Sequence, residues 1–451
     1  MAKLNEHPTV KKYYADKVES KPAVENINSS GELESVWLRR ICLEAGADDV
    51  GFINAESPGL ENDRTDIERY FPYTKALISV GCGMNREPVR SPARSVANLE
   101  FHHTGDRVNS VASAIVSKLE EAGVKAANPS MGFPMEMSRF PGKIWTISHK
   151  NVAVAAGLGQ MGIHRNVIHP KFGNFILLGT ILIDYDVDSY SSPIDYNPCL
   201  ECKLCVAACP VGAISSEGHF NFTSCYTHNY REIMGGFNDW VEGIAESRSD
   251  REYSQRFSDA ESSSMWQSLS YGANYKAAYC MAVCPAGEDV IKPFLENRKS
   301  YLNEVLRPLQ SKEETLYVIK GSDAEQHAEK RFPQKSLKRV SSGLRPSSAK
   351  GFLEGLPILF QPNKSNSIDA VIHFSFTGKE QLKGTAVIRN GSIKTFEGHR
   401  DKADLSIKAD SCSWIGFIRK EKSLVWAILT GKIRLGGSIK LLKQFGDCFP
   451  S

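Results

Sequence analysis

The chain has 451 residues, of which 41% are hydrophobic and 24% charged, and its formal net charge is +3. This length exceeds what one compact core accommodates and indicates about three domains, while the weak charge gives no electrostatic case for a nucleic-acid partner. No apolar run reaches the roughly 18 residues of a membrane helix, and the first residues lack the apolar core of a signal peptide. We therefore expect a cytoplasmic protein whose eleven cysteines stay reduced.

The N-terminal part predicts a polar lead-in over residues 1–35 and a domain of helices and strands over residues 36–190. Two apolar runs, 76–84 and 175–184, have the length and composition of buried strands. Between them, residues 108–123 carry apolar side chains at helical spacing and end on a glycine, which is a helix stop signal. This alternation favours an α/β or α+β fold.

A G-x-G-x-x-G pattern is formed by Gly157, Gly159 and Gly162, and Asp184 follows 22 residues later. Such a pattern is typical of a dinucleotide-binding turn when a long helix starts there. Pro170 lies only eight residues beyond the last glycine and would interrupt that helix. We therefore reject a dinucleotide site.

Seven cysteines lie within residues 199–284, and the first four have the spacing C-x2-C-x2-C-x3-C-P. This spacing lets a tight loop give three thiolates to one [4Fe–4S] cluster, while the fourth serves a second cluster. A zinc site is the weaker alternative, because zinc sites usually show two separated cysteine pairs. By the ferredoxin rule, the first cluster takes Cys199, Cys202, Cys205 and Cys284, and the second takes Cys209, Cys225 and Cys280.

The second set is one thiolate short, because Ala277 stands where a cysteine is expected, three residues before Cys280. We expect a [4Fe–4S] first cluster and a second cluster that is [3Fe–4S], or [4Fe–4S] with an oxygen or histidine ligand, or lost.

The 54 residues after Cys225 are rich in aromatic side chains and either cap a substrate pocket or form a surface subdomain. The scattered cysteines are expected to be buried, inert thiols: Cys42, Cys82, Cys412 and Cys448.

Residues 301–349 are interpreted as a connecting segment, and the seven basic residues without an acidic one in 330–350 suit a solvated linker. Residues 350–451 form a separate unit. Within it, 370–378 alternates as a half-buried strand does, and 385–398 predicts a hairpin that turns at Asn390-Gly391.

Over about residues 38–295 the chain resembles the epoxyqueuosine reductase and reductive dehalogenase superfamily. The resemblance rests on the stretch AAGLGQMG, on the strand pattern that follows it, and on the cysteine cassette behind both. It implies that residues 36–190 form a nitroreductase-like domain that binds base-off cobalamin. It further implies that residues 191–300 form a ferredoxin-like module whose two clusters supply electrons. The residues implied in cofactor binding are Gly157, Gly159, Gly162, His164 and Arg165.

The proton donor of these enzymes has no matching residue here. Epoxyqueuosine reductases carry an aspartate about thirteen residues before the glycine stretch, where this chain has Lys143. The nearest ionisable candidates are Lys143, His149 and Lys150, of which we take the first two as catalytic candidates; a tyrosine of the aromatic insertion is the other source. The tRNA-recognising helical repeats of epoxyqueuosine reductases are also missing, which argues against epoxyqueuosine as the substrate.

Residues 350–448 resemble the sterol-carrier-protein-2-like domain on Asp404, Asp410, Trp414 and the turn Gly431-Lys432-Ile433. This resemblance implies a curved sheet with helices over an apolar tunnel, and thus a hydrophobic ligand. The alternatives are a dimerisation or lid role, or a packed accessory domain without a ligand.

The overall expectation is an α+β protein that acts as a corrinoid- and iron–sulfur-dependent reductase of a small hydrophobic organic substrate. The reaction would be reductive dehalogenation, dehydroxylation or epoxide reduction, with electrons from an external ferredoxin or flavodoxin. The alternative is a non-catalytic electron-transfer or corrinoid-handling protein with a lipid-binding module. Nucleic acid is not expected as a partner, and a homodimer is left open.

Overall fold

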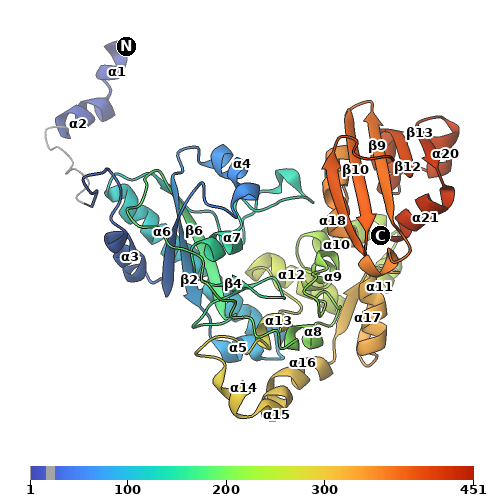
Figure 1. Ribbon diagram of the computed structural model, residues 1–451, viewed down its shortest axis with the longest axis horizontal. Coiled ribbons are helices and arrows are strands. Elements are labelled where there is room, and N and C mark those ends of the chain that lie inside the picture. Colours follow the sequence, from blue (N-terminus) through green and yellow to red (C-terminus); the bar gives the residue numbers. More distant parts are fainter. Residues whose placement is uncertain (1, 17–25, 451) are drawn as a thin grey trace.

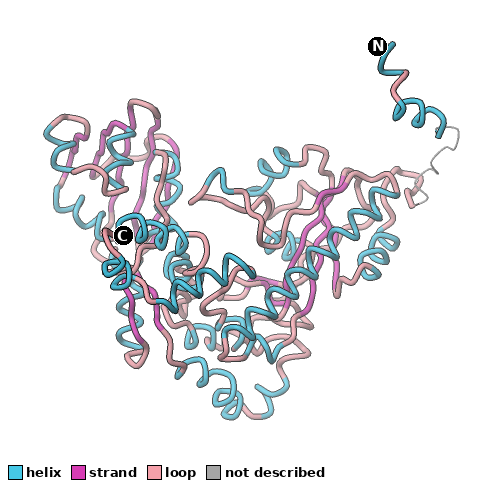
Figure 2. Tube along the Cα trace, turned by 180° about the vertical axis from the view of Figure 1, so that it is seen from behind, coloured by secondary structure: helices cyan, strands magenta, loops and turns pink. Residues whose placement is uncertain are grey.

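The computed structural model describes residues 2–16 and 26–450, and it places two sheet domains on either side of a mainly helical middle region (Figure 1). The same arrangement is seen from behind in Figure 2. Among the described residues, no helix is both long enough and apolar enough to cross a bilayer. The predicted lead-in lies partly outside the described residues. Its described part contains α1 (Ala2–Asn5) and α2 (Pro8–Asp16), and then Leu33, which is fully buried against the first domain.

The first sheet has the strand order β1-β2-β6-β3, and every neighbouring pair is antiparallel. Its strands are β1 (Asp49–Asn54), β2 (Ala76–Gly83), β6 (Ile176–Ile183) and β3 (Ala126–Ala127). Both strands predicted from apolar runs are confirmed as β2 and β6, the two central strands. Both are mainly apolar, apart from the buried Ser79 and Thr180, because helices cover both faces of the sheet.

Alternate residues of the central strands pack against different helices. Ile78 and Ile181 face α3 (Ser35–Glu44) and α6 (Arg94–Glu121), whereas Leu77 and Leu182 face α4 (Glu61–Tyr70) and α7 (His149–Ala155). The helix predicted over 108–123 is the C-terminal part of α6, which starts earlier and ends before Gly123, a residue with φ of +83°.

No helix follows the glycine-rich pattern. The chain instead forms the short hairpin of β4 (Gln160–Met161) and β5 (Val167–Ile168). The long helix that starts at a dinucleotide-binding turn is absent from this described segment.

The middle region consists of short helices that carry the cysteines and the aromatic insertion. The helix α5 (Arg86–Arg90) packs against it from the first domain. Its own helices are α8 (Leu204–Ala208), α9 (Phe222–Asn229), α10 (Gly235–Glu246), α11 (Asp250–Arg256), α12 (Asp259–Tyr271), α13 (Tyr279–Ala282), α14 (Lys292–Glu296), α15 (Arg298–Tyr301) and α16 (Arg307–Ser311).

The basic segment 330–350 is not the solvated linker that its composition suggested. It contains β8 (Ser336–Arg339), which pairs in parallel with β7 (Thr315–Val318) across the helix α17 (Asp323–Arg331). The Lys335 side chain is fully buried, and its Nζ lies 2.6 Å from a Glu314 oxygen. Composition alone suggested solvation because the carboxylates that pair with these lysines lie elsewhere in the chain.

The C-terminal domain is a five-stranded sheet with the order β11-β10-β9-β12-β13, in which only β9 and β12 are parallel. The predicted strand is confirmed as β9, and the predicted hairpin as β10 and β11, with Asn390 and Gly391 both at positive φ. Helices cover one face over an aromatic core that includes Phe352, Phe374 and Trp414. The elements are α18 (Ala349–Leu359), β9 (Ala370–Thr377), β10 (Leu382–Arg389), β11 (Ser392–Glu397), β12 (Leu405–Asp410), α19 (Ser411–Ile418), α20 (Leu424–Leu429), β13 (Ile433–Gly437) and α21 (Ile439–Asp447).

Candidate iron–sulfur site

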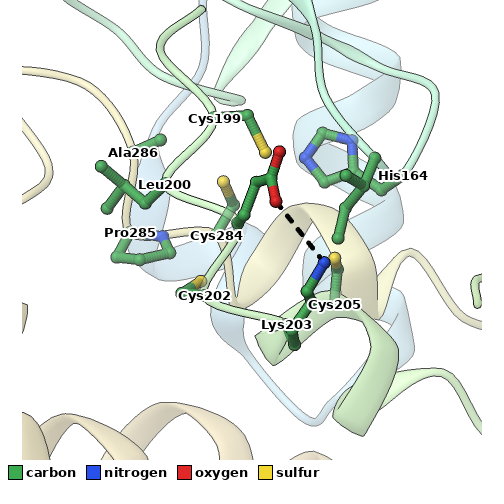
Figure 3. A pocket seen from close by; sticks show the side chains of 11 residues that line it. His164, Cys199, Leu200, Cys202, Lys203, Cys205, Cys284, Pro285 and Ala286 are labelled. Carbon is green, nitrogen blue, oxygen red and sulfur yellow. Dashed lines mark ion pairs between the residues drawn. The ribbon is translucent and has the colours of Figure 1, made fainter. Parts of the chain in front are cut away.

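Four of the predicted ligand cysteines line one cavity, into which their sulfur atoms point from three sides (Figure 3). They are Cys199 and Cys202 on the loop before α8, Cys205 on α8, and Cys284 just after α13. The loop turns tightly, because Glu201 and Lys203 both have positive φ. The side chains of these two residues form an ion pair of 3.7 Å at the cavity.

The thiols surround a space rather than a point. Among the described residues, no three cysteine, histidine or carboxylate side chains converge as the ligands of a single metal ion would. Burial raises the pKa of Cys284 to about 12, and neighbouring thiols add to this effect. Such thiols stay protonated at neutral pH unless a cationic centre holds them as thiolates, which the irons of a cluster would do.

The other three predicted ligands also lie together. Cys209 ends α8, Cys225 is on α9, and Cys280 is on α13. Their thiols are close enough for Cys209 to raise the pKa of both others, after burial as the main cause. The Ala213 amide donates to the Cys209 sulfur at 3.2 Å. At the position of the missing thiol, the Ala277 amide donates to Asn229 Oδ1 at 2.8 Å.

The three glycines of the G-x-G-x-x-G pattern are in contact with the chain itself. A Cβ atom on Gly157 would lie 2.4 Å from the Ser192 carbonyl oxygen, and one on Gly159 would lie 2.3 Å from the Ile168 carbonyl oxygen. A Cβ on Gly162 would lie 2.8 Å from the His164 ring. These glycines allow close internal packing and leave no cradle for a cofactor at their own Cβ positions. Corrinoid contact at these residues stays a prediction.

His164 lines the four-cysteine cavity, and burial lowers its pKa to about 4, so the ring is neutral at pH 7. Its Nδ1 accepts a hydrogen bond from the Asn166 amide at 3.1 Å, which assigns the proton to Nε2. Nε2 lies 3.1 Å from Asn174 Nδ2, while the Asn174 Oδ1 is buried without a hydrogen-bond partner. Exchanging the two amide atoms turns the oxygen toward Nε2 as the acceptor that this tautomer requires. His164 therefore fits beside a cluster as a neutral group.

The two catalytic candidates from the sequence are held by other parts of the first domain. Lys143 Nζ lies 2.6 Å from Asp63 and 2.7 Å from Asp66, two almost fully buried carboxylates. Both His149 ring nitrogens are engaged at 2.9 Å, one with the Thr180 hydroxyl and one with the Ser130 carbonyl oxygen. A catalytic role for Lys143 and His149 stays a prediction.

Lys150 belongs to the surroundings of the second cysteine set. Its Nζ donates to the Arg165 carbonyl and to Asn166 Oδ1, both at 2.8 Å. The residue is exposed to solvent, and desolvation by the surrounding protein lowers the pKa of its ammonium group, while nearby Cys280 and Cys225 act in the opposite direction. In the sequence, only the proximity of Lys150 to the glycine stretch indicated this position.

Replacing Lys150 by methionine is expected to lower the reduction potential of the second cluster, because a positive charge stabilises the added electron. The shift should be on the order of tens of millivolts for a partly solvated charge. A redox titration followed by EPR measures it. Lys203→Met, which removes a half-exposed ammonium paired with Glu201, should leave that potential unchanged, and an unshifted potential in Lys150→Met would contradict the assignment.

A chain of tyrosines leads away from the second cysteine set. Tyr226 and Tyr230 stack at 5.2 Å between ring centroids, and Tyr230 meets Tyr275 edge to face at 5.6 Å. Burial raises the pKa of Tyr230, to which Tyr275, Cys225 and Cys280 contribute. Part of the predicted aromatic insertion therefore lies at the cysteines, whereas its Trp266 and Tyr271 are exposed.

Of the four scattered cysteines, Cys42, Cys82 and Cys448 are buried as expected, and burial raises the pKa of each. Cys412 is exposed, which corrects the expectation for that residue. It lies in the first turn of α19, whose buried side is formed by its neighbours Ser411 and Trp414.

His228 is a buried residue of α9, three residues after Cys225 of the second cysteine set. It is expected to lower the stability of the folded protein at acid pH. Burial lowers its pKa to about 4 from an ordinary 6.5. Between these two pH values the unfolded chain takes up a proton that the folded chain refuses, so the stability falls as the pH falls. By pH 5 the loss from this group should be about 2 kcal/mol.

The measurement is the free energy of unfolding at pH 7.5 and pH 5. His228→Gln should lose less stability than the wild type between these two conditions. His103→Gln removes an exposed histidine of α6 and should behave as the wild type does. An equal loss in all three proteins would show that His228 is not the group responsible.

Residues 192–215 match the 4Fe-4S binding domain family, which defines the class of the site as an iron–sulfur centre. Curated epoxyqueuosine reductases are similar to the chain. The one from Prochlorococcus marinus is 27% identical over 192 residues, covering 40% of this chain and 57% of the relative. The one from Staphylococcus aureus is 24% identical over 174 residues, covering 36% and 42%. The chain spans about half the length of the curated relatives it matches.

Solved structures give weaker similarity of the same kind. A catabolic reductive dehalogenase matches with a TM-score of 0.37 and 16% identity, covering 60% of this chain and 34% of the other. The epoxyqueuosine reductase from Streptococcus thermophilus matches with a TM-score of 0.33 and 17% identity, covering 60% and 75%. The resemblance to epoxyqueuosine reductases is confirmed by the curated relatives. The sterol-carrier-protein-2-like assignment stays a prediction.

Proposed function

We propose that the chain is an iron–sulfur-dependent reductase of a small organic substrate, with two cysteine-held clusters that pass electrons one at a time. The observation that carries the proposal is the grouping of seven cysteines into two adjacent sets, four around one cavity and three beside it. The helix α8 joins the sets, because Cys205 belongs to one and Cys209 to the other, one turn apart. Clusters so close together exchange electrons readily.

A groove beside the first set is the proposed place for the substrate. It has a volume of about 700 Å³ and is lined by Met84, Phe172, Phe175 and polar residues that include Arg86 and Glu87. This volume falls in the range of roughly 300–1,000 Å³ that is typical of small-molecule sites. The mixture of apolar and charged lining residues suits an organic substrate with one polar group.

One contact connects the groove to the first cysteine set. Gly173, between the groove residues Phe172 and Phe175, lies against Ala286, so that a Cβ on Gly173 would clash with the Ala286 carbonyl oxygen. Ala286 lines the four-cysteine cavity. The proposed substrate site and the first cluster site therefore share a wall.

Cobalamin is the cofactor that the resemblance implies, and when bound it would supply a strongly reducing cobalt centre. The glycine positions implied for it are filled by the chain's own atoms, so no step proposed here depends on it. This chain's own residues hold the clusters, exclude water from them and supply protons. Burial raises the pKa values of Tyr230 and Tyr275, which makes them weaker acids than an ordinary tyrosine, and neither lines the groove. The proton donor is left unassigned among Lys143, His149 and these tyrosines.

The curated relatives bear on the substrate as well. They are named epoxyqueuosine reductase, and one solved epoxyqueuosine reductase is described with an epoxyqueuosine-modified tRNA stem loop. This weakens the expectation that nucleic acid is not a partner. A modified tRNA stem loop therefore belongs in the substrate panel beside small halogenated and epoxide compounds.

The proposal is tested by anaerobic reconstitution with iron and sulfide, with and without added cobalamin, followed by metal analysis and absorption spectra. Reduced viologen then serves as the electron donor for the substrate panel. Turnover that depends on the clusters supports a reductase. Iron uptake without turnover of any substrate would instead favour the alternative, an electron-transfer protein.

A further inference from the structure

Large apolar side chains are exposed at the outer edge of the C-terminal domain. Val425, Trp426 and Leu429 on α20 are 67%, 68% and 74% exposed, and Ile439 at the start of α21 is 80% exposed. The segment LVWAIL of α20 contains no polar residue, and only Ala427 of the helix is buried. A helix that is apolar on all sides cannot cover itself by packing one side on a sheet.

The buried core of the domain is formed by other side chains. Its interior is occupied by Phe352, Phe374, Phe376, Trp414 and Phe445, which form a continuous set of ring contacts. α20 lies beside β13, on the far side of the domain from the first sheet (Figure 1). The helix α20 therefore lies on the side of the C-terminal domain that is remote from the first sheet domain (Figure 1).

The chain around this apolar surface is strongly basic. Between residues 419 and 443 there are seven basic residues and a single acidic one, Glu421, which is paired with Arg419 at 2.9 Å. All seven basic side chains are exposed: Arg419, Lys420, Lys422, Lys432, Arg434, Lys440 and Lys443. An exposed apolar surface with a tryptophan, flanked by cations, complements the interface of a bilayer that contains anionic lipids.

We propose that this surface, formed by α20 and the start of α21, docks the protein on an anionic membrane. The apolar side chains enter the boundary between headgroups and acyl chains, and the lysines and arginines remain at the phosphate level. The attachment is peripheral and reversible. It concerns a different surface from the proposed reductase site and does not depend on that function.

The test is co-sedimentation of the full chain with phospholipid vesicles. Vesicles of phosphatidylcholine with one third phosphatidylglycerol are expected to bind the protein, and vesicles of phosphatidylcholine alone to bind it much less. The double variant Trp426→Ser/Leu429→Ser should lower the binding by at least about tenfold, since two large side chains no longer enter the interface. Lys432→Glu/Arg434→Glu should remove most of the preference for the anionic vesicles.

The matched control is Trp266→Ser on α12, which also replaces an exposed tryptophan, 57% exposed in this case, and should bind as the wild type does. The proposal is overturned if anionic vesicles do not bind the wild type, or if the Trp426→Ser/Leu429→Ser variant binds them equally well. It is also overturned if light scattering shows a dimer that this variant abolishes, because the surface would then join two copies of the chain.

Discussion

Replacing Cys284 by alanine is expected to remove one of two clusters and about half of the bound iron. Cys284 is the only ligand of the first set that comes from outside the loop and helix of residues 199–205, and it closes the cavity from the side of α13. Three thiolates from one loop cannot enclose a four-iron cube on all sides. Electron transfer would then lack one of the two clusters, and reductase turnover should fall to background.

The measurements are the iron and acid-labile sulfide contents of anaerobically reconstituted protein, together with its absorption spectrum. Cys82→Ala is the matched control, since Cys82 is a fully buried thiol in β2 that lines neither cysteine site. It should retain the full iron content. A Cys284→Ala protein with wild-type iron content would refute the assignment of this ligand.

Replacing Ala277 by cysteine is expected to give the second cluster its fourth thiolate. The wild-type set of Cys209, Cys225 and Cys280 suits a three-iron cluster, whose oxidised form is paramagnetic, whereas an oxidised [4Fe–4S] cluster with four thiolates is diamagnetic. In the variant, the EPR signal of the oxidised protein should disappear, and the iron content should rise by about one atom per chain.

The neighbouring substitution Ala278→Cys is the control, because it adds a thiol one residue away, where Ala278 lines a different small cavity beside Arg94 and Lys312. Its EPR spectrum should match that of the wild type. If Ala277→Cys also leaves the spectrum unchanged, the vacancy at residue 277 is not the reason for the incomplete ligand set.

Much of the fold could be predicted because the responsible signals are local. In β2 and β6, apolar residues occupy consecutive positions and not only alternate ones, which indicates strands buried on both faces, and Asn390-Gly391 specifies a tight hairpin by the positive φ that both residues adopt. The sequence predicts only the C-terminal part of α6. The buried side of its N-terminal half carries polar residues, among them Glu100 and Thr104, which are hydrogen-bonded to each other inside the protein. The spacing of polar residues in a sequence does not show that they are buried.

The candidate site likewise has a part that the sequence predicts and a part that it does not. The spacing of Cys199, Cys202 and Cys205 was informative because one tight loop determines where all three thiols lie. The surroundings of the second set were only partly predictable, since Lys150 reaches it from a distant segment, whereas Tyr230 follows Cys225 by five residues at the end of α9. Nothing in their local sequence distinguishes them from surface residues.

By itself, the sequence determined which cysteines group together, where the central strands run and where the hairpin turns, because each depends on residues close in the chain. The tertiary structure alone decided that the basic segment contributes a paired strand and the buried Lys335, that Lys143 is held by two carboxylates, and that α20 faces outward. These features depend on which distant segments pack against one another. Burial and charge pairing arise at the contacts between such segments, and composition does not encode them.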